Sequence, residues 1–348
     1  MNRWSRRAFL KKMGLTGAYL ASSASFLASC GGAAAPAPAT EEAAEKAAAA
    51  PAQLADMTMQ AAWINDAEFM GYFVGLAQGF YEAEGIKLTY LSGGPDIIPE
   101  TTLLTGAAGL ALTTLETVVA ANLEQGANFK FIGTQYQKSP IGIVSLPEKP
   151  INTIADLAGK TLAVPSVNLI AVEETLKLND IDPAEVKIVP YQYDPTVLIK
   201  GEVDATLDFV TSVPFAIKAE TGIEPITFLL YDYGFKVPND LVAVTEDYLN
   251  ANRGLLVSWL RASRRGWEEN FKDIEGWPKK FEASWFKGTG RPVEAEISFN
   301  KAQQSLIEHP DGIFTMTDES IGEYIDVMKL IGLEATREMF VTDLLQEI

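Results

Sequence analysis

The sequence predicts an α/β fold in which short strands alternate with helices and build largely parallel sheets. Runs rich in Val, Ile, Thr and aromatic residues recur from residue 59 onward, and many are separated by stretches whose apolar residues lie three or four apart. Glycines also stand where helix C-termini are expected, at Gly85, Gly106, Gly126 and Gly222. A chain of 348 residues is long enough for two lobes, each with its own core.

The expected elements follow in order. Strands are predicted at residues 59–64, 86–91, 109–114, 129–136, 141–146, 161–166, 186–191, 205–210, 226–231 and 241–245. Helices are predicted at residues 68–83, 99–105, 115–125, 170–179 and 195–200. After Thr245 the pattern is almost wholly helical, broken at Trp277-Pro278 and at 288–290. No internal repeat with a fixed period is visible.

Composition limits the function classes. Apolar residues make up 47% of the chain, which is ordinary for a globular protein. The formal net charge of −18 argues against nucleic acid as a partner, because phosphate binding needs a basic stripe. Cys30 is the single cysteine, so an intrachain disulfide is impossible.

The N-terminus has the features of a processed targeting segment. Residues 1–29 hold five basic residues and no acid, and Ser5 to Lys11 resembles a twin-arginine export signal. The apolar run that follows ends in Leu27-Ala28-Ser29-Cys30, which resembles a bacterial lipobox. We therefore expect a signal peptide at 1–29 and lipid attachment at Cys30, which would anchor the mature protein to the extracytoplasmic face of the membrane. An unmodified cysteine at the end of an ordinary signal peptide is the alternative.

Residues 30–56 are rich in Ala, Pro and Glu and have no large apolar side chain before Leu54. Such a segment cannot bury enough surface to offset the entropy of ordering. It is interpreted as a disordered tether between the anchor and the folded part.

In α/β sheets, ligands bind beyond the carboxyl ends of the strands. Here the sequences that follow the predicted strands pair polar residues with aromatic residues or glycine. Each has a local structural alternative: Asn65 with Glu68 fits a capping box, the Gly-Gly-Pro-Asp turn fits helix N-cap chemistry, and Thr114 with Glu116 fits ordinary capping. Their number favours a ligand site, for which the candidates are Trp63, Asn65, Asp66, Phe69, Tyr72, Gly94, Asp96, Glu116, Tyr136, Asn168, Asp208, Phe209, Tyr231 and Tyr233.

Three segments carry a family resemblance. They are GYFVGLAQGFYEAEGIKLTYLSGGPD (71–96), INTIADLAGKTLAVPS (151–166) and LIKGEVDATLDF (198–209). From Met57 onward the chain resembles the solute-binding proteins of ABC importers, in the superfamily of nitrate-, sulfonate-, taurine- and thiamine-pyrimidine-binding proteins. The Gly-Gly-Pro-Asp turn and the Ala-Glu-Phe-x-Gly-Tyr-Phe run are more similar to the vitamin-precursor and riboflavin-binding lipoproteins than to the nitrate or sulfonate branch.

This resemblance implies a two-lobed periplasmic-binding-protein fold of type II, which closes on its ligand about a hinge. The first lobe is expected at 57–146 with 239–348, and the second at 147–238, with crossings near 141–146 and 231–238. The implied partners are a membrane permease and a small ligand, and a monomer is expected.

The ligand can be narrowed by charge. An oxyanion needs Arg, Lys or several helix N-terminal amides. Every arginine after the signal peptide lies in the C-terminal helical part, and Lys138 is the single cation at a predicted strand exit. Aromatic rings and proton acceptors suit a neutral flat heterocycle instead. Riboflavin is the preferred ligand, a thiamine-type aminopyrimidine is the alternative, and nitrate or a sulfonate is less favoured.

An enzyme is the competing class, because thiamine-pyrimidine synthases share the superfamily. His309 is the single histidine and lies in a loop-like context, so His-based metal sites, Cys–His dyads and Ser–His–Asp triads lack parts. No catalysis, metal or cofactor is expected. A purely structural surface protein would have neither a closing cleft nor a ligand.

Overall fold

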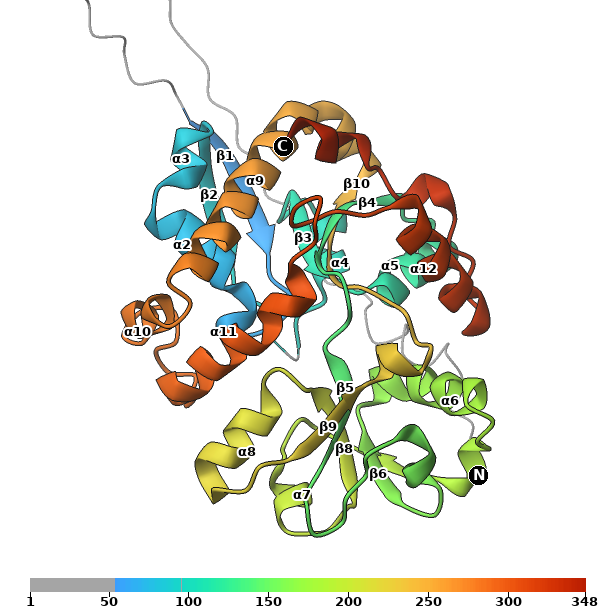
Figure 1. Cartoon of the computed structure of the whole chain (residues 1–348). Helices are drawn as coiled ribbons and strands as arrows, with labels where there is room; N and C mark the ends of the chain where they lie inside the picture. The colour runs from blue at the N-terminus through green and yellow to red at the C-terminus, as the bar shows by residue number, and fades with distance from the viewer. Residues whose placement is uncertain (1–53, 95) are drawn as a thin grey trace, which may run out of the picture. The chain divides into compact units, whose positions relative to one another are not determined.

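The computed structural model describes residues 54–94 and 96–348, and it contains two five-stranded sheets (Figure 1). The predicted signal peptide, Cys30 and most of the tether lie outside the described residues. Within these ranges, no helix is both long and apolar enough to cross a membrane.

Sheet A forms the first lobe and has the order β2-β1-β3-β10-β4. Its strand β1 pairs in parallel with β2 and β3, whereas β10 is antiparallel to β3 and β4. The strands are β1 (Ala55–Gln60), β2 (Ile86–Leu91), β3 (Leu110–Thr113), β4 (Phe129–Tyr136) and β10 (Asn239–Thr245).

Sheet B forms the second lobe and has the order β7-β6-β8-β5-β9. Here β6 is parallel to β7 and β8, and β5 is antiparallel to β8 and β9. The strands are β5 (Ile141–Ser145), β6 (Thr161–Val164), β7 (Lys187–Pro190), β8 (Ala205–Phe209) and β9 (Ile226–Leu229). Both sheets are therefore mixed, and the prediction of an α/β two-lobed fold is confirmed with one antiparallel strand inserted into each sheet.

The chain crosses between the sheets twice. The first crossing runs through residues 137–140, because β4 ends in sheet A at Tyr136 and β5 begins in sheet B at Ile141. Residues 141–146, which the sequence assigned to the first lobe, thus lie in the second. The return crossing follows β9 and reaches sheet A at Asn239. One core cluster contains Phe131 of the first lobe, Ile143 of the second and Phe235 of the return crossing, so the hinge is packed.

The helix predicted at 68–83 is three pieces. A 3-10 turn η1 (Ala67–Phe69) leads into α2 (Met70–Ala77), and Gly79, with φ of +68°, separates α2 from α3 (Phe80–Ala83). A left-handed φ is accessible to glycine without a Cβ penalty, so the helix ends there. The other helices of the α/β region are α4 (Pro99–Leu104), α5 (Leu115–Gln125), α6 (Leu169–Leu178), α7 (Thr196–Ile199) and α8 (Val213–Thr221).

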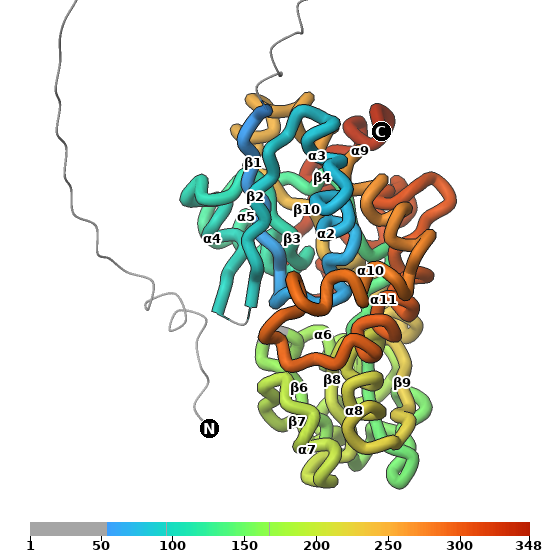
Figure 2. The backbone as a smooth tube through the Cα atoms, turned by 90° about the vertical axis from the view of Figure 1, so that its left-hand side faces the viewer, coloured from blue at the N-terminus to red at the C-terminus, as the bar shows by residue number. Residues whose placement is uncertain are grey.

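The C-terminal third returns to the first lobe. It comprises α9 (Glu246–Lys272), α10 (Gly276–Phe281), α11 (Val293–Ile307) and α12 (Asp318–Leu330). In Figure 2, α10 and α11 lie where the first lobe approaches the second. The remaining 3-10 turns are η2 (Ile154–Leu157), η3 (Ser166–Asn168), η4 (Pro183–Glu185), η5 (Leu230–Tyr233), η6 (Arg337–Met339) and η7 (Asp343–Glu347).

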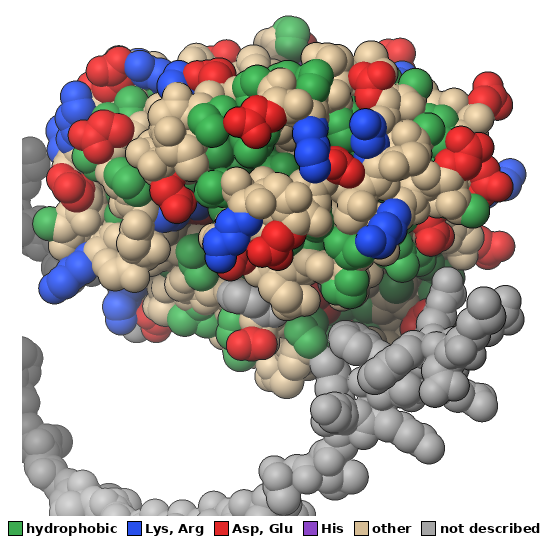
Figure 3. All heavy atoms as spheres, turned by 90° about the horizontal axis from the view of Figure 1, so that it is seen from below, with side chains coloured by type: hydrophobic (Ala, Val, Ile, Leu, Met, Phe, Trp, Pro, Cys, Tyr) green, Lys and Arg blue, Asp and Glu red, His purple; other side chains and the backbone are tan. Residues whose placement is uncertain are grey.

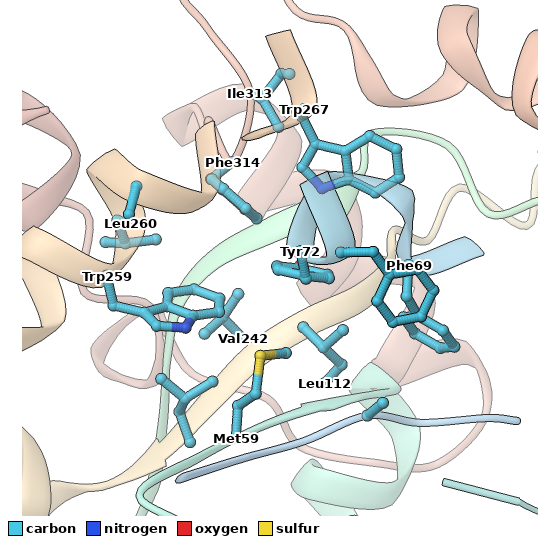
Figure 4. Close-up of a cluster of buried hydrophobic side chains, with 14 of the residues drawn as sticks. Met59, Phe69, Tyr72, Leu112, Val242, Trp259, Leu260, Trp267, Ile313 and Phe314 are labelled. Atoms are coloured by element: carbon cyan, nitrogen blue, oxygen red, sulfur yellow. The ribbon is translucent and has the colours of Figure 1, made fainter. Parts of the chain in front are cut away.

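Two predicted ligand contacts are core residues. Phe69 at the end of η1 and Tyr72 in α2 are both fully buried. The Tyr72 ring stacks on Trp259 with centroids 5.7 Å apart (Figure 4). Trp267 lies against the edge of Tyr72 with centroids 6.1 Å apart. These rings have no free face for a ligand. The aromatic spacing that suggested a site is the apolar face of a core helix.

Candidate functional site

The loop after β1 is both a helix cap and a part of the space between the lobes. Asp66 caps η1, because its Oδ1 accepts a hydrogen bond from the Glu68 N–H at 3.0 Å. The capping residue is thus Asp66, one position after the Asn65 that the sequence suggested. Asn65 is half-buried, and its Oδ1 has no hydrogen-bond partner among the described residues.

An aromatic chain links the two lobes. Trp63, just beyond β1, contacts Tyr193 of the second lobe with ring centroids 5.2 Å apart, and Tyr193 contacts Tyr191 at 5.9 Å. Tyr193 lies in the loop after β7 and has a left-handed φ of +60°. A bulky residue in this region is strained and is held there only by its surroundings. The exits of β1 and β7 therefore face each other.

Buried polar atoms without partners gather at the end of β8. Tyr191, Thr206, Asp208 and Thr211 are at most 4% exposed, and one side-chain oxygen of each has no hydrogen-bond partner within the described part of the chain. Burial raises the pKa of Asp208 to about 7. Burial and the Asp208 carboxyl group together raise the pKa of Tyr191. Because buried polar groups normally find partners, this group has the features of a binding surface.

Two predicted residues also approach each other across the first crossing. The Tyr136 ring of β4 lies edge-on to Phe209 at the end of β8, with centroids 6.5 Å apart. Tyr136 is buried, and its hydroxyl donates to Gln303 Oε1 at 2.6 Å. This hydroxyl is thus occupied, whereas Phe209 is partly exposed.

Arg291 corrects the expectation that arginine is absent from the strand exits. It precedes α11 and is distant in sequence from both sheets, yet its Nη2 donates to Ser212 Oγ of the second lobe at 2.7 Å. Its Nε pairs with Glu296, and its Nη1 lies 4.0 Å from Asp66 Oδ2. Lys138, the cation noted in the sequence, instead lies over the Tyr231 ring at 5.1 Å from its centroid.

A pair of acids lies beneath this loop. Asp240, at the start of β10, has a φ of +50° and is 1% exposed. Gln135 Nε2 donates to its Oδ2 at 3.0 Å and to the Glu68 carbonyl at 2.8 Å. Burial raises the pKa of Asp240 to about 7. Burial and the neighbouring Asp240 also raise the pKa of Glu68, so both carboxyl groups favour the protonated form.

The other predicted site residues are in part more exposed than Asp66 and Asp208. The loop with Gly94 is close to Trp63, because the Gly93 N–H donates to the Trp63 carbonyl at 2.8 Å. Asp96 is exposed, whereas Glu116 and Asn168 are half-buried after β3 and β6. Tyr233 packs edge-on against Phe228, with ring centroids 4.9 Å apart.

The sequence could have suggested some of the missed residues. Tyr191 ends the strand predicted at 186–191 and Gln192-Tyr193 follow it, so the strand-exit rule applied to them as well. Arg291 carries no such signal, because its contact with Ser212 joins segments 79 positions apart.

These geometries can now be set beside known proteins. Residues 66–275 match the family described as NMT1/THI5 like. This chain belongs to the NMT1/THI5-like family. The matched range runs from the Asp66 cap to just beyond α9, so it includes Asp208, Tyr193 and Ser212 but not Trp63 or Arg291.

This chain is also similar to individual proteins of known name. It is 28% identical to the riboflavin-binding protein RibY of Chloroflexus aurantiacus over 240 residues, which cover 67% of this chain and 68% of RibY. Its fold is that of the periplasmic aliphatic sulphonate binding protein SsuA of Escherichia coli, with a TM-score of 0.65, 14% identity, and coverage of 80% and 86% of the two chains.

An enzyme shares the fold as well. The desulfurization enzyme DSZB matches with a TM-score of 0.56 and 14% identity, over 83% of this chain and 98% of DSZB. The fold alone therefore does not separate binding from catalysis. His309, the single histidine, lies in a surface loop where its Nδ1 accepts a hydrogen bond from the Asp311 N–H. Together, the family and the relatives support the coarse interpretation of a solute-binding protein of the ABC-importer type.

Proposed function

We propose that this NMT1/THI5-like protein captures riboflavin or a closely related flavin outside the cytoplasm and delivers it to an ABC-importer permease. Its similarity to RibY supports the ligand class, and its fold supports capture between two lobes. Lipid attachment at Cys30 remains part of this proposal. No bond is made or broken; ligand affinity for the closed form supplies the shift in population.

The observation that carries the proposal is the pairing of rings with unpartnered buried oxygens between the strand exits. Trp63 and Tyr193 meet across the lobes with their ring planes tilted by 58°, and an isoalloxazine ring would stack on both once the two rings separate and turn parallel. Asp208 and Thr211 lie deeper, with oxygens that lack partners in the described structure. The hydroxyl groups of a ribityl chain, or the imide N–H of the ring, would supply the missing donors.

Riboflavin titration tests the proposal directly. The purified protein should quench flavin fluorescence in a saturable manner, since stacking on tryptophan and tyrosine quenches flavins. Thiamine, an aminopyrimidine, nitrate and taurine serve as competitors in the same assay. Saturable binding of any of these without binding of riboflavin would overturn the ligand assignment.

The Asp208→Asn variant should lose about 10–100-fold in riboflavin affinity, because a buried unmet hydrogen bond costs about 1–3 kcal/mol. The amide keeps the shape of the side chain but replaces one acceptor with a donor. Isothermal titration calorimetry measures the change. Glu202→Gln is the control, since Glu202 is exposed on the same lobe and should leave affinity unchanged. Equal affinities in the wild type and Asp208→Asn would remove Asp208 from the site.

The Trp63→Ala variant should weaken riboflavin binding about tenfold or more and remove part of the fluorescence quenching, because one of two stacking faces is lost. Trp63 is only half-buried, so the fold should persist. Trp63→Phe is the matched control and should retain most of the affinity. If Trp63→Ala binds and quenches like the wild type, the flavin ring lies elsewhere.

A further inference from the structure

The guanidinium group of Arg291 has partners in both lobes. Its Nη2 donates to Ser212 Oγ at 2.7 Å, its Nε pairs with Glu296, and its Nη1 faces Asp66 Oδ2 at 4.0 Å. The side chain is only 19% exposed. Arginine recognises sulfonate and carboxylate groups through two parallel N–H donors, and here two of the three guanidinium nitrogens already donate to protein oxygens.

The two acids that hold Arg291 are themselves fixed by the backbone. Glu296 is fully buried, and its Oε2 accepts from the Ala67 N–H at 2.7 Å. Asp66 is 2% exposed and caps η1 through Oδ1, which leaves Oδ2 directed at the arginine. The guanidinium is therefore held from two sides, and neither acid can swing away without giving up a backbone hydrogen bond.

This cluster lies between the lobes. Ser212 precedes α8 in the second lobe, whereas Asp66 and Glu296 belong to the first. A cavity of 270 Å³ lies beside it, lined by Ala216 and Glu220 of the second lobe and by Gly290, Arg291 and Ala295 of the first. Glu220 adds a further acid to this cavity. A cation at the meeting point of two lobes would otherwise attract an anionic solute.

Charge on the outer surface does not replace this cation. On the face seen from below in Figure 3, acidic and basic side chains of the described residues are interspersed, and neither sign forms a continuous area. This face therefore offers no continuous basic area that would attract an anionic solute.

We propose that Asp66 and Glu296 determine ligand selectivity by neutralising Arg291, so that the cleft accepts uncharged solutes and rejects sulfonates and carboxylates. This inference rests on the proposed function, in which the solute binds between the lobes. It makes Asp66 and Glu296 specificity-determining residues that act through Arg291. Removing their charge would convert the same cleft into an oxyanion site.

Neutralising variants test the inference. Asp66→Asn keeps the cap, because the amide oxygen can still accept from the Glu68 N–H. Wild type, Asp66→Asn and Asp66→Asn/Glu296→Gln are titrated calorimetrically at pH 8.5, because burial raises the pKa of Asp66 to about 7 and the wild-type carboxylate is ionised above that pH. The ligands are methanesulfonate and dimethyl sulfone, an uncharged molecule of similar shape. The wild type should show no detectable binding of methanesulfonate. The double variant should bind it with an affinity at least about tenfold above the detection limit, and Asp66→Asn should lie between the two. Dimethyl sulfone should bind none of them.

Adding Arg291→Ala to Asp66→Asn should abolish the gained sulfonate binding. This result would identify the guanidinium as the group that binds the sulfonate. Thermal melts show which variants are folded; the single variant suffices if the double variant does not fold. A folded Asp66→Asn protein that ignores methanesulfonate, or one whose binding survives Arg291→Ala, would overturn the inference. Riboflavin is titrated in parallel, so its failure to bind would count against the proposed ligand while leaving the sulfonate result intact.

Discussion

The Gly266→Ala variant is expected to lose about 3 kcal/mol or more of unfolding free energy, or to fail to fold. A Cβ atom at Gly266 would lie 2.1 Å from the Gly71 carbonyl oxygen, which is far inside van der Waals contact. Both atoms belong to rigid helices, α9 and α2, so the overlap can be relieved only by separating them.

Separating these helices would disturb the core of the first lobe. The Trp267 ring packs on Gly71, where a Cβ would lie 2.3 Å from the ring, and Trp259 stacks on Tyr72 about two turns earlier in α9 (Figure 4). Ser263 of α9 also hydrogen-bonds to Tyr81 of the adjoining α3 at 2.9 Å. One added methyl group would therefore loosen several buried side chains together.

Urea unfolding and thermal melts measure the effect. The matched control is Gly254→Ala on the same helix, because a Cβ there meets nothing within 4 Å. Alanine favours helix over glycine by up to about 1 kcal/mol, so this control should be neutral or slightly stabilising. A Gly266→Ala protein within about 1 kcal/mol of the wild type would show that α2 and α9 do not require this close approach.

The ligand-free protein is expected to be more stable near pH 5.5 than near pH 8.5, by at least about 5 °C in melting temperature. Burial raises the pKa of Asp66, Asp208 and Asp240 to about 7 in the folded protein, against 3.8 for each without burial. Between these values the folded state binds more protons than the unfolded state. Its stability therefore falls as pH rises from about 4 to 7, and it levels off above that range.

The reason is the cost of ionising carboxyl groups that are shielded from water. Near Asp66, the acids Glu68, Asp240 and Glu296 share one cation, Arg291. Asp208 lies apart from them in the second lobe, and one pKa unit corresponds to about 1.4 kcal/mol. Below about pH 5 a second group of acids lowers the stability again. Asp204 is an example: its hydrogen bonds to Thr161 and Lys149 lower its pKa, and protonation weakens these bonds.

Differential scanning fluorimetry across pH 5.5–8.5 measures this dependence. Asp208→Asn should flatten the curve and raise the melting temperature at pH 8.5, since the amide cannot ionise. The same variant is expected to bind ligand more weakly, so stability and function should change in opposite directions. Glu334→Gln, at an exposed position, should follow the wild-type curve. A melting temperature that increases with pH over this window would contradict the assignment.

Local patterns were sufficient for most of the elements. The strands 86–91 and 129–136 and the helix 115–125 lie where the residue patterns predict them, since β-branched runs and apolar spacing act over a few residues. The first strand is displaced: β1 ends at Gln60, so Trp63 belongs to the loop beyond it. The stretch from Ala61 to Ile64 is apolar like a strand, but its side chains are buried or partly buried in a loop.

Sequence alone determined the α/β class, the two-lobed family fold and the strand exits that hold Trp63, Asp66 and Asp208, because these follow from local patterns and family motifs. Tertiary structure alone decided which exit residues are core, as for Phe69 and Tyr72, and brought Tyr193 to Trp63 and Arg291 to Asp66. The physical reason is that burial and charge pairing depend on segments far apart in the chain. A pattern of a few residues predicts where a side chain leaves a strand, and the packing of the two lobes decides what it meets.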